Sequence, residues 1–286
     1  MKRKENYIMV PFDFQPESKM ALKAALKIGK TLGMRIEVIQ FKPIENAAFL
    51  PNVGLMGGNG AAIPQLVKTE QKFEGMDEFL RVLEEMNALH RDIHFHQIEE
   101  SPEAGIKEFM HENDPSLLVI HKEAFKGSNP LTGSVVQRII RHTDMPVLAL
   151  EGSVLPESFK NIVLPTDVSR FLPTEADFIS HWVDSFNSTV HLLNVVHTDL
   201  IDDEEIKSKM QKVALELGFE KFFVNATHHD KEVEAIVEFS EQVDADLIMM
   251  KTYDKTGLER FLFGSITEDV VKAPSPAVLA VNVSMN

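Results

Sequence analysis

Two aspartates follow short apolar runs at matching points of the chain. Asp13 comes after the run YIMVPF, and Asp167 comes after the run NIVLPT, which ends in Thr166. A carboxylate at the end of a strand accepts hydrogen bonds, so each aspartate could hold a ribose hydroxyl or the donor edge of a base. The alternative is a turn residue or a helix cap, because aspartate favours those positions too.

Two Gly-Ser pairs also match. Gly133 and Ser134, and likewise Gly264 and Ser265, stand where we expect the last helix of each half of the chain to begin. The free N–H groups and the dipole of a helix N-terminus favour an anion such as phosphate. Because the dipeptide is also an ordinary helix start, both interpretations stay open.

The loop before the second Gly-Ser pair adds candidate ligands for the same anion. It begins at Lys251 and contains Gly257 and Arg260. Cationic side chains bind phosphate oxygens through charge-assisted hydrogen bonds, and glycine lets the backbone come close. We therefore expect any small ligand of the second half to lie near Asp167, Gly257 and that Gly-Ser pair.

These candidates lie at the ends of elements that occur twice. Asp167 repeats the position of Asp13 after 154 residues, and the segment IKEF at 106–109 returns after 130 residues as IVEF at 236–239. The first copy is therefore the longer one. Its Gly-rich segment at about 46–65 has the composition of an inserted loop.

Strands alternate with helices in both copies, which is typical of βαβ units and a parallel sheet. We expect two tandem Rossmann-like α/β domains, each a five-stranded parallel sheet flanked by helices, over residues 1–152 and 158–286. The expected helices include 67–89, with Phe79 and Leu80 in its apolar stripe, and 265–272. Ligands of such sheets bind beyond the carboxyl ends of the strands, where both aspartates are predicted to lie.

Composition excludes several function classes. The formal net charge is −15, which disfavours nonspecific binding to nucleic acid. The chain has no cysteine, so thiol chemistry and sulfur-ligated metals are excluded. No apolar run is long enough to span a membrane or to act as a signal peptide, and we expect a cytoplasmic protein. His90, His94 and His96 could suggest a metal site, but their spacing favours surface histidines, so we expect no bound metal.

The chain resembles the universal stress protein family. In the second copy the likeness rests on DLIMM at 246–250, TGLERFLFGSI at 256–266 and PSPAVLA at 274–280. In the first copy it rests on VPFD at 10–13, GSVV at 133–136 and HTDMPVL at 142–148. The resemblance implies adenine nucleotide alpha hydrolase-like domains that pair through their last strands as an internal pseudo-dimer, with a further homodimer left open.

The resemblance also shows a departure. Family members that bind ATP carry a loop of the form G-x-x-G-x9-G-[ST], in which glycines let the backbone close on the phosphates. Here Lys251 and Asp254 replace the first two glycines of the second copy, and Ile120 and Glu123 stand at the matching positions of the first. Because these four side chains do not allow the backbone conformations that are open to glycine, we expect degenerate nucleotide loops.

No G-x-S-x-G elbow, H-E-x-x-H helix or Walker loop occurs, and we expect no enzyme, although weak ATP hydrolysis stays open. The leading hypothesis is a non-catalytic stress-response or adaptor protein that binds a protein partner or a small molecule. One alternative is an ATP-binding switch that uses the second copy. Another is a binding module for a small apolar ligand.

Overall fold

The computed structural model describes residues 6–42, 75–89, 91–125, 134–143, 145–152, 158–168, 171, 173–197, 202–251 and 260–281. The elements of the first half are β1 (Tyr7–Phe12), α1 (Pro16–Leu32), β2 (Arg35–Lys42), α2 (Met76–Glu85), β3 (Ile93–Glu99), α3 (Pro102–Asn113), β4 (Leu117–His121), α4 (Val135–His142) and β5 (Val147–Leu150). Those of the second half are β6 (Asn161–Pro165), α5 (Pro173–Phe186), β7 (Thr189–Val196), α6 (Asp203–Glu216), β8 (Phe222–His228), α7 (Glu232–Gln242), β9 (Leu247–Lys251), α8 (Arg260–Lys272) and β10 (Ala277–Val281).

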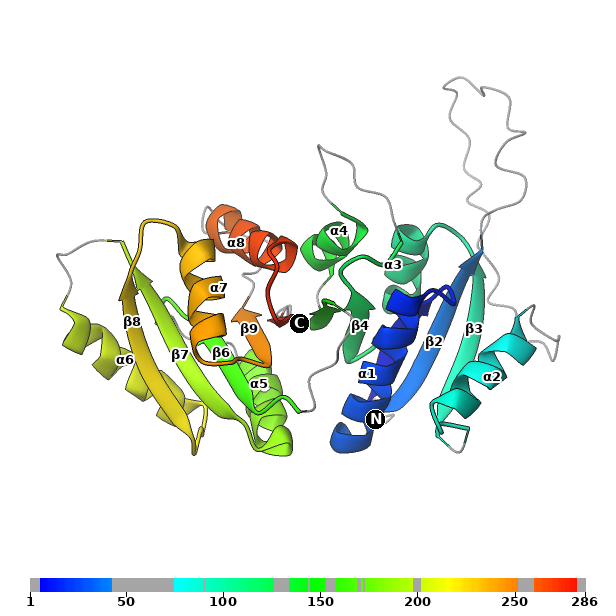
Figure 1. Ribbon diagram of the computed structural model, residues 1–286, viewed down its shortest axis with the longest axis horizontal. Coiled ribbons are helices and arrows are strands. Elements are labelled where there is room, and N and C mark those ends of the chain that lie inside the picture. Colours follow the sequence, from blue (N-terminus) through cyan, green and yellow to red (C-terminus); the bar gives the residue numbers. More distant parts are fainter. Residues whose placement is uncertain are drawn as a thin grey trace, which may run out of the picture.

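The strands form one ten-stranded sheet in the order β3-β2-β1-β4-β5-β10-β9-β6-β7-β8. Each half contributes five parallel strands, as the alternating pattern predicts. The last strands of the halves, β5 and β10, pair antiparallel, with Leu148 opposite Leu279. The order reads the same from either end, so the halves lie as a pseudo-dimer within one chain (Figure 1). The predicted fold and the pairing through the last strands are confirmed.

Helices cover both faces of this sheet. One apolar core contains residues of α1, α2, α5 and α6, and the other contains residues of α3, α4, α7 and α8. Both cores include strand residues from both halves, because side chains of successive strand residues point to opposite faces. Within the described residues, no helix is both long enough and apolar enough to cross a membrane.

Helix α1 shows how the local sequence sets these elements. Proline occupies its first turn, where a missing N–H is harmless, and Gly33 ends it in a left-handed conformation with φ of 66°. Ala21, Ala25 and Ile28 are buried against the sheet. Their spacing places them on one helical face, so α1 covers the strands as the sequence pattern predicts.

Two expected helix boundaries need correction. Helix α8 begins at Arg260, whereas the sequence pattern favoured a start at Ser265. A glycine inside a helix costs only about 1 kcal/mol relative to alanine, so Gly264 does not force the helix to begin after it. Gly264 and Ser265 therefore lie beyond the first four residues of α8, whose N–H groups lack helical partners.

Helix α2 covers Met76–Glu85, and Leu80, expected to be buried, is 45% exposed. Residues 67–74 and the 46–65 insertion lie outside the described residues.

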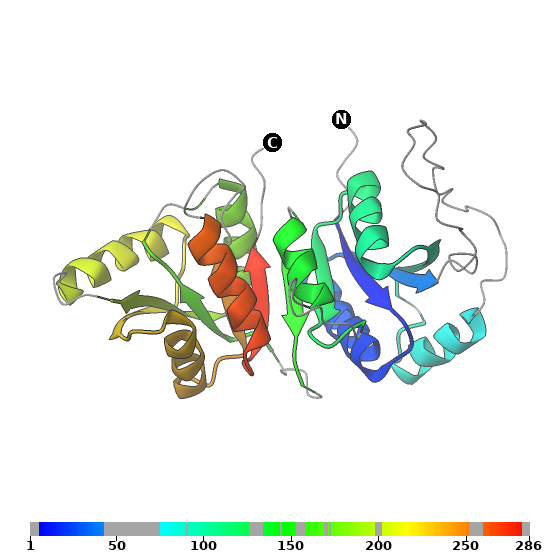
Figure 2. The ribbon, with the colours of Figure 1, turned by 90° about the horizontal axis from the view of Figure 1, so that it is seen from above.

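Polar contacts between the halves surround the β5–β10 pair. Seen from above, β10 lies beside β5 in the middle of the molecule (Figure 2). Helices α4 and α8 contact each other there. The Gln137 amide donates to the Glu268 carbonyl across 3.2 Å, and Arg141 forms an ion pair with the Glu268 carboxylate.

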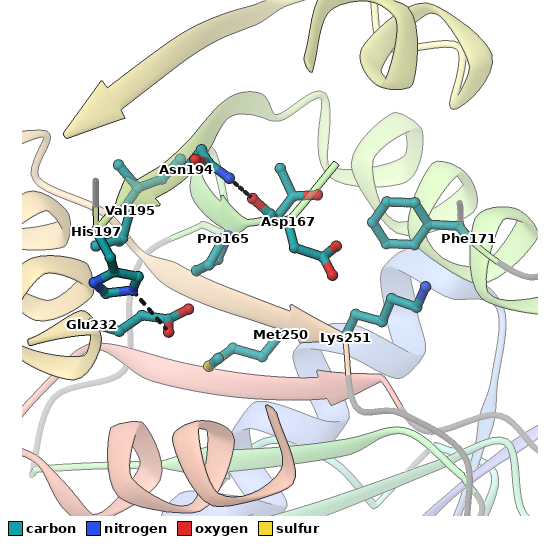
Figure 3. A pocket seen from close by; sticks show the side chains of 11 residues that line it. Pro165, Asp167, Phe171, Asn194, Val195, His197, Glu232, Met250 and Lys251 are labelled. Carbon is teal, nitrogen blue, oxygen red and sulfur yellow. Dashed lines mark hydrogen bonds and ion pairs between the residues drawn. The ribbon is translucent and has the colours of Figure 1, made fainter. Parts of the chain in front are cut away.

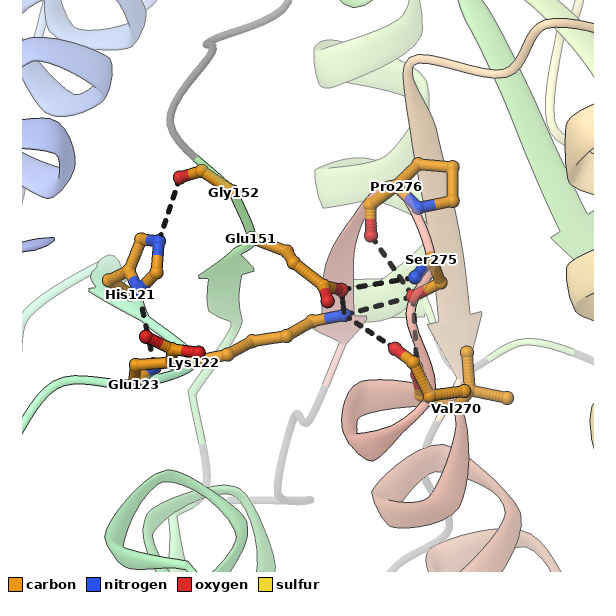
Figure 4. Close-up of polar contacts among 9 residues, drawn as sticks. His121, Lys122, Glu123, Glu151, Gly152, Val270, Ser275 and Pro276 are labelled. Atoms are coloured by element: carbon orange, nitrogen blue, oxygen red, sulfur yellow. Dashed lines mark hydrogen bonds and ion pairs between the residues drawn. The ribbon is translucent and has the colours of Figure 1, made fainter. Parts of the chain in front are cut away.

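Lys122 connects the two halves at this junction. Among the described cations that do so, it has the least exposed side chain. It directly follows β4, and its side chain is 9% exposed. Its Nζ lies 2.6 Å from Glu151 Oε2, 2.9 Å from Ser275 Oγ and 3.3 Å from the Ala273 carbonyl (Figure 4). The Ser275 N–H also donates to Glu151 Oε2 at 3.0 Å. Burial lowers the pKa of Lys122, and the Glu151 carboxylate opposes that effect.

Replacing Lys122 by alanine is expected to cost about 3 kcal/mol of unfolding free energy, because the Glu151 carboxylate would lose its enclosed partner. Urea denaturation of the full chain measures this loss. The matched control is Lys207→Ala, which removes an exposed, solvent-screened pair with Glu204 and is expected to leave the stability almost unchanged. Equal losses in the two variants would show that the Lys122 contacts do not hold the halves together.

Candidate functional site

A cavity lies at the carboxyl ends of β6, β7 and β9 in the second half. Its volume is about 170 Å³. The lining residues are Pro165, Thr166, Asp167, Phe171, Leu193, Asn194, Val195, His197, Glu232, Met250 and Lys251 (Figure 3). Strand β6 lies between β9 and β7, so the cavity opens where the strand order reverses. This is the predicted location for a ligand of a parallel sheet.

Hydrogen bonds hold the turn after β6 in a defined shape. The Thr166 N–H donates to the Leu193 carbonyl at 2.8 Å, and the Asn194 side chain donates to the Thr166 carbonyl at 2.7 Å. Val168 then takes a left-handed conformation with φ of 60°, and its N–H donates to Thr166 Oγ1 at 3.0 Å. The sharp turn places the Asp167 carboxylate at the cavity, between the β7 and β9 sides of the site (Figure 3).

One end of the cavity is acidic. Glu232, at the start of α7, lies there with His197, whose Nε2 is 3.7 Å from Glu232 Oε2 (Figure 3). Burial raises the pKa of the Glu232 carboxyl, and the negative charge of Asp167 raises it further, while His197 acts in the opposite direction. Asp167 and Glu232 are therefore close enough to repel each other electrostatically.

The other end carries a cation that is paired with a buried carboxylate. Lys251 Nζ lies 3.7 Å from Glu175 Oε2, and the Glu175 side chain is 2% exposed. The same ammonium lies 4.9 Å from the centre of the Phe171 ring. A cation held by a carboxylate and an aromatic face has much of its charge balanced before any ligand arrives.

Large side chains lie at the corresponding end of the first half. The strand registers make Phe41 the counterpart of Val195. The Phe41 ring packs edge-to-face against Phe125, with ring centres 5.9 Å apart. It also lies against Gly105, where an added Cβ would be 2.5 Å from the ring. In the second half the strand residue is the smaller Val195, and the helix residue is Ala235, which is larger than the matching Gly105.

The predicted residues of the first half have structural roles. Asp13 Oδ1 accepts a hydrogen bond from the Gln15 N–H at 3.1 Å, which closes the turn before α1. Ser134 is the N-cap of α4 and forms a capping box with Gln137. The Ser134 hydroxyl and N–H are thus both occupied by protein partners. These contacts match the turn and cap alternatives, and the ligand alternative stays a prediction.

The predicted residues of the second half fall into two groups. Thr166 and Asp167 lie at the cavity, together with Lys251. The backbone of Arg260, Gly264 and Ser265 lies in α8, which begins at Arg260. The expected start of this helix at Gly264 is therefore wrong. Gly133 and Gly257 fall outside the described residues.

Sequence reasoning missed His197 and Glu232. His197 directly follows β7, and Glu232 begins the helix that follows β8. Both positions are at the carboxyl ends of strands, where ligands of parallel sheets bind. A search of every residue just after a predicted strand would have found His197, whereas Glu232 required knowing where α7 begins.

Two of the three histidines that could suggest a metal site, His94 and His96, instead lie beside a buried carboxylate. Glu37 on β2 is 3% exposed. Its oxygens lie 2.5 Å from His96 Nε2, 3.2 Å from His94 Nδ1 and 2.8 Å from Arg35 Nε. No group of three or more acidic or histidine side chains in the described ranges is arranged to hold a metal ion. His90 falls outside those ranges.

Comparison with known proteins gives a consistent family match. The model described as the universal stress protein family matches residues 6–151 and 158–282. Universal stress protein MJ0531 of Methanocaldococcus jannaschii is 33% identical in an alignment of 146 residues, which covers 43% of this chain and 82% of that protein.

Two solved structures share the fold along nearly the whole chain. One is a universal stress protein from Archaeoglobus fulgidus, with a TM-score of 0.67 and 16% identity over 98% of this chain and 97% of that one. The other is a putative universal stress protein from Pseudomonas aeruginosa, with a TM-score of 0.65 and 18% identity over 97% and 93% of the two chains. At these identities the likeness establishes the architecture.

Replacing Glu37 by glutamine is expected to lower stability at neutral pH by about 1–3 kcal/mol. Burial acts to raise the pKa of Glu37, but the His96 hydrogen bond and the charges of His96, His94 and Arg35 outweigh it and hold the pKa below its ordinary value of 4.5. The contribution is therefore complete above that value and lost as the pH falls through the lower folded pKa. Urea denaturation of the unaltered protein and of the variant, from neutral pH to below 4.5, tests whether their difference in unfolding free energy disappears as the pH falls. Glu99→Gln, an exposed change on β3, is the control. An equal pH response in both variants would contradict the assignment.

Proposed function

Because the chain belongs to the universal stress protein family, we propose that it is a non-catalytic stress-response protein whose second half binds a small molecule. The difference between the halves carries the proposal. The second half keeps a cavity beside Asp167, while Phe41 and Phe125 pack together over the matching end of the first. The protein therefore acts as an adaptor with one ligand-responsive half and one structural half.

Binding without chemistry fits the side chains at the cavity. Among the lining residues described, Thr166 is the one with a hydroxyl, and its Oγ1 accepts a hydrogen bond from the Val168 N–H. The chain has no cysteine. Covalent catalysis by a hydroxyl needs activation by an adjacent base, and this hydroxyl instead accepts a hydrogen bond that shapes the turn.

The site is poorly suited to a triphosphate. Lys251 is paired with Glu175, and Asp167 and Glu232 add negative charge to the lining. An anion binds at the first turn of a helix. The N–H groups of Gly264 and Ser265 lie beyond the first turn of α8. Tight binding of ATP is therefore not expected, and the ATP-dependent switch remains the second candidate, to be distinguished by experiment.

Exchanging the packing pair of the first half into the second tests where the ligand binds. The Val195→Phe/Ala235→Gly variant reproduces the Phe41 and Gly105 pair and is expected to fill the cavity. Native mass spectrometry of freshly purified protein should show a small molecule on the unaltered chain and none on this variant. The control is the reciprocal Phe41→Val/Gly105→Ala variant, which should keep the ligand. Equal occupancy of the unaltered and filled proteins, or none in either, would contradict the proposal.

Calorimetric titration with ATP separates the two candidate functions. The proposal predicts no binding in the micromolar range. If ATP binds in that range and the Val195→Phe/Ala235→Gly variant loses it, the cavity is a nucleotide site and the switch is the correct function.

A further inference from the structure

We propose that two copies of this chain associate through the helical layer that contains α1 and α5, with α1 of each copy lying against α5 of the other. The inference goes beyond the proposed function, because none of the residues that carry it lines the cavity. It assigns a partner of stated chemistry, a second copy of this chain, to a surface that carries both signs of charge.

Helix α1 carries lysines along its outer face. Lys19, Lys23, Lys27 and Lys30 are separated by four, four and three residues, which places them on one side of a helix. The buried residues of α1 lie on the other side, against the sheet. Lys23 and Lys30 are exposed, and we call these two the basic pair. The basic pair therefore points away from the sheet.

Helix α5 carries the opposite charge at the matching positions. The repeat of 154 residues relates Lys23 to Asp177 and Lys30 to Asp184. Both aspartates are exposed, and we call them the acidic pair. In the described part of the chain none of these four side chains forms an ion pair. Their charges are therefore available to a partner.

The two pairs lie in one layer of helices. Helices α1 and α5 contact each other and contribute to the same apolar core, so they cover the same face of the sheet, between α2 and α6 (Figure 1). Because the halves join through antiparallel strands, α1 and α5 run in opposite directions. This surface is thus basic on one helix and acidic on the adjacent one.

A surface divided in this way is complementary to itself. In a twofold-symmetric dimer each copy uses the same patch. Turning a second copy over about an axis along the line between α1 and α5 places its basic helix opposite the acidic helix of the first copy, and the reverse. An in-plane axis perpendicular to that line would instead bring like charges together. Charge therefore selects one of these two face-to-face arrangements.

A polyanion fits this surface less well than a second copy does. A nucleic acid or an anionic membrane that lay along α1 would also lie beside Asp177 and Asp184. The second half is the more acidic one, with 22 acidic and 11 basic side chains in residues 158–286, against 21 and 18 in residues 1–152. A second copy supplies both charges in the arrangement that the surface requires.

The expected association is weak and sensitive to salt. The 17 residues of α1 and the 14 residues of α5 form helices about 25 and 21 Å long. Two adjacent helices of this size cover about 400 Å² per copy, with an axis separation of about 10 Å. This area is at the lower end for protein complexes, and exposed ion pairs are screened by salt. We therefore expect a reversible dimer.

Charge reversal tests the arrangement. Sedimentation equilibrium of the unaltered full chain should show monomers and dimers, with fewer dimers as salt is raised from about 0.1 M to about 1 M. Lys23→Glu/Lys30→Glu places acidic side chains opposite the acidic pair. Asp177→Lys/Asp184→Lys places basic side chains opposite the basic pair. Each variant should weaken dimerisation at least about tenfold, because every contact occurs twice in a twofold dimer.

Mixing the two variants gives the sharper test. Each variant alone has like charges at both contacts, whereas a dimer of one chain of each has opposite charges at both. Native mass spectrometry with one chain labelled by nitrogen-15 should show that mixed dimer. Both chains keep a net negative charge, so attraction between whole molecules does not account for it. The chain with all four substitutions should also dimerise again.

Lys107→Glu/Lys231→Glu is the matched control. It changes the net charge by the same amount as Lys23→Glu/Lys30→Glu, but on α3 and at the start of α7, in the opposite layer. It should leave dimerisation unchanged, and circular dichroism checks that every variant is folded. The inference is overturned if the unaltered chain stays monomeric, if its dimer is insensitive to salt, or if charge reversal and the control have equal effects. Failure of the mixed variants to associate would also overturn it.

Discussion

The antiparallel pairing of β5 with β10 is the interaction on which the rest of the structure depends. Each half alone would leave the backbone groups of its last strand unpaired at a sheet edge, a liability that proteins usually cover. Pairing these edges makes one ten-stranded sheet and lets both apolar cores continue across the junction. Lys122, Glu151 and Ser275 then add a partly buried polar bridge beside the strands.

Within this shared frame the halves differ by a compensated exchange of size. Phe41 faces Gly105 in the first half, whereas Val195 and Ala235 stand at the matching positions of the second. Close packing makes such changes local, because a large side chain needs a small one opposite it. One exchange of this kind places an aromatic ring against Phe125 and Gly105 in the first half, whereas Val195 lines the cavity of the second half.

The sequence predicted the parts of the fold that depend on repetition and periodicity. The alternating apolar runs predicted parallel strands buried on both faces, and the repeat placed Asp13 and Asp167 correctly at matching strand ends. It could not distinguish a Gly-Ser pair that caps a helix, as at Ser134, from one inside a helix, as at Gly264, because the same dipeptide suits both. Nor could it place Glu232 at the cavity that Asp167 lines, since that placement depends on three-dimensional packing between elements far apart in the chain.

The bridge at Lys122 has a consequence for how the protein diverged from a symmetric ancestor. In an exact twofold dimer every interface residue occurs twice, so each substitution is tested at two places at once. Here the repeat-related positions of Lys122, Glu151 and Ser275 carry Thr252, Asn282 and Asp144. Covalent fusion thus let each side of the seam mutate independently, and a recombined pair of two first halves would lack the complementary serine.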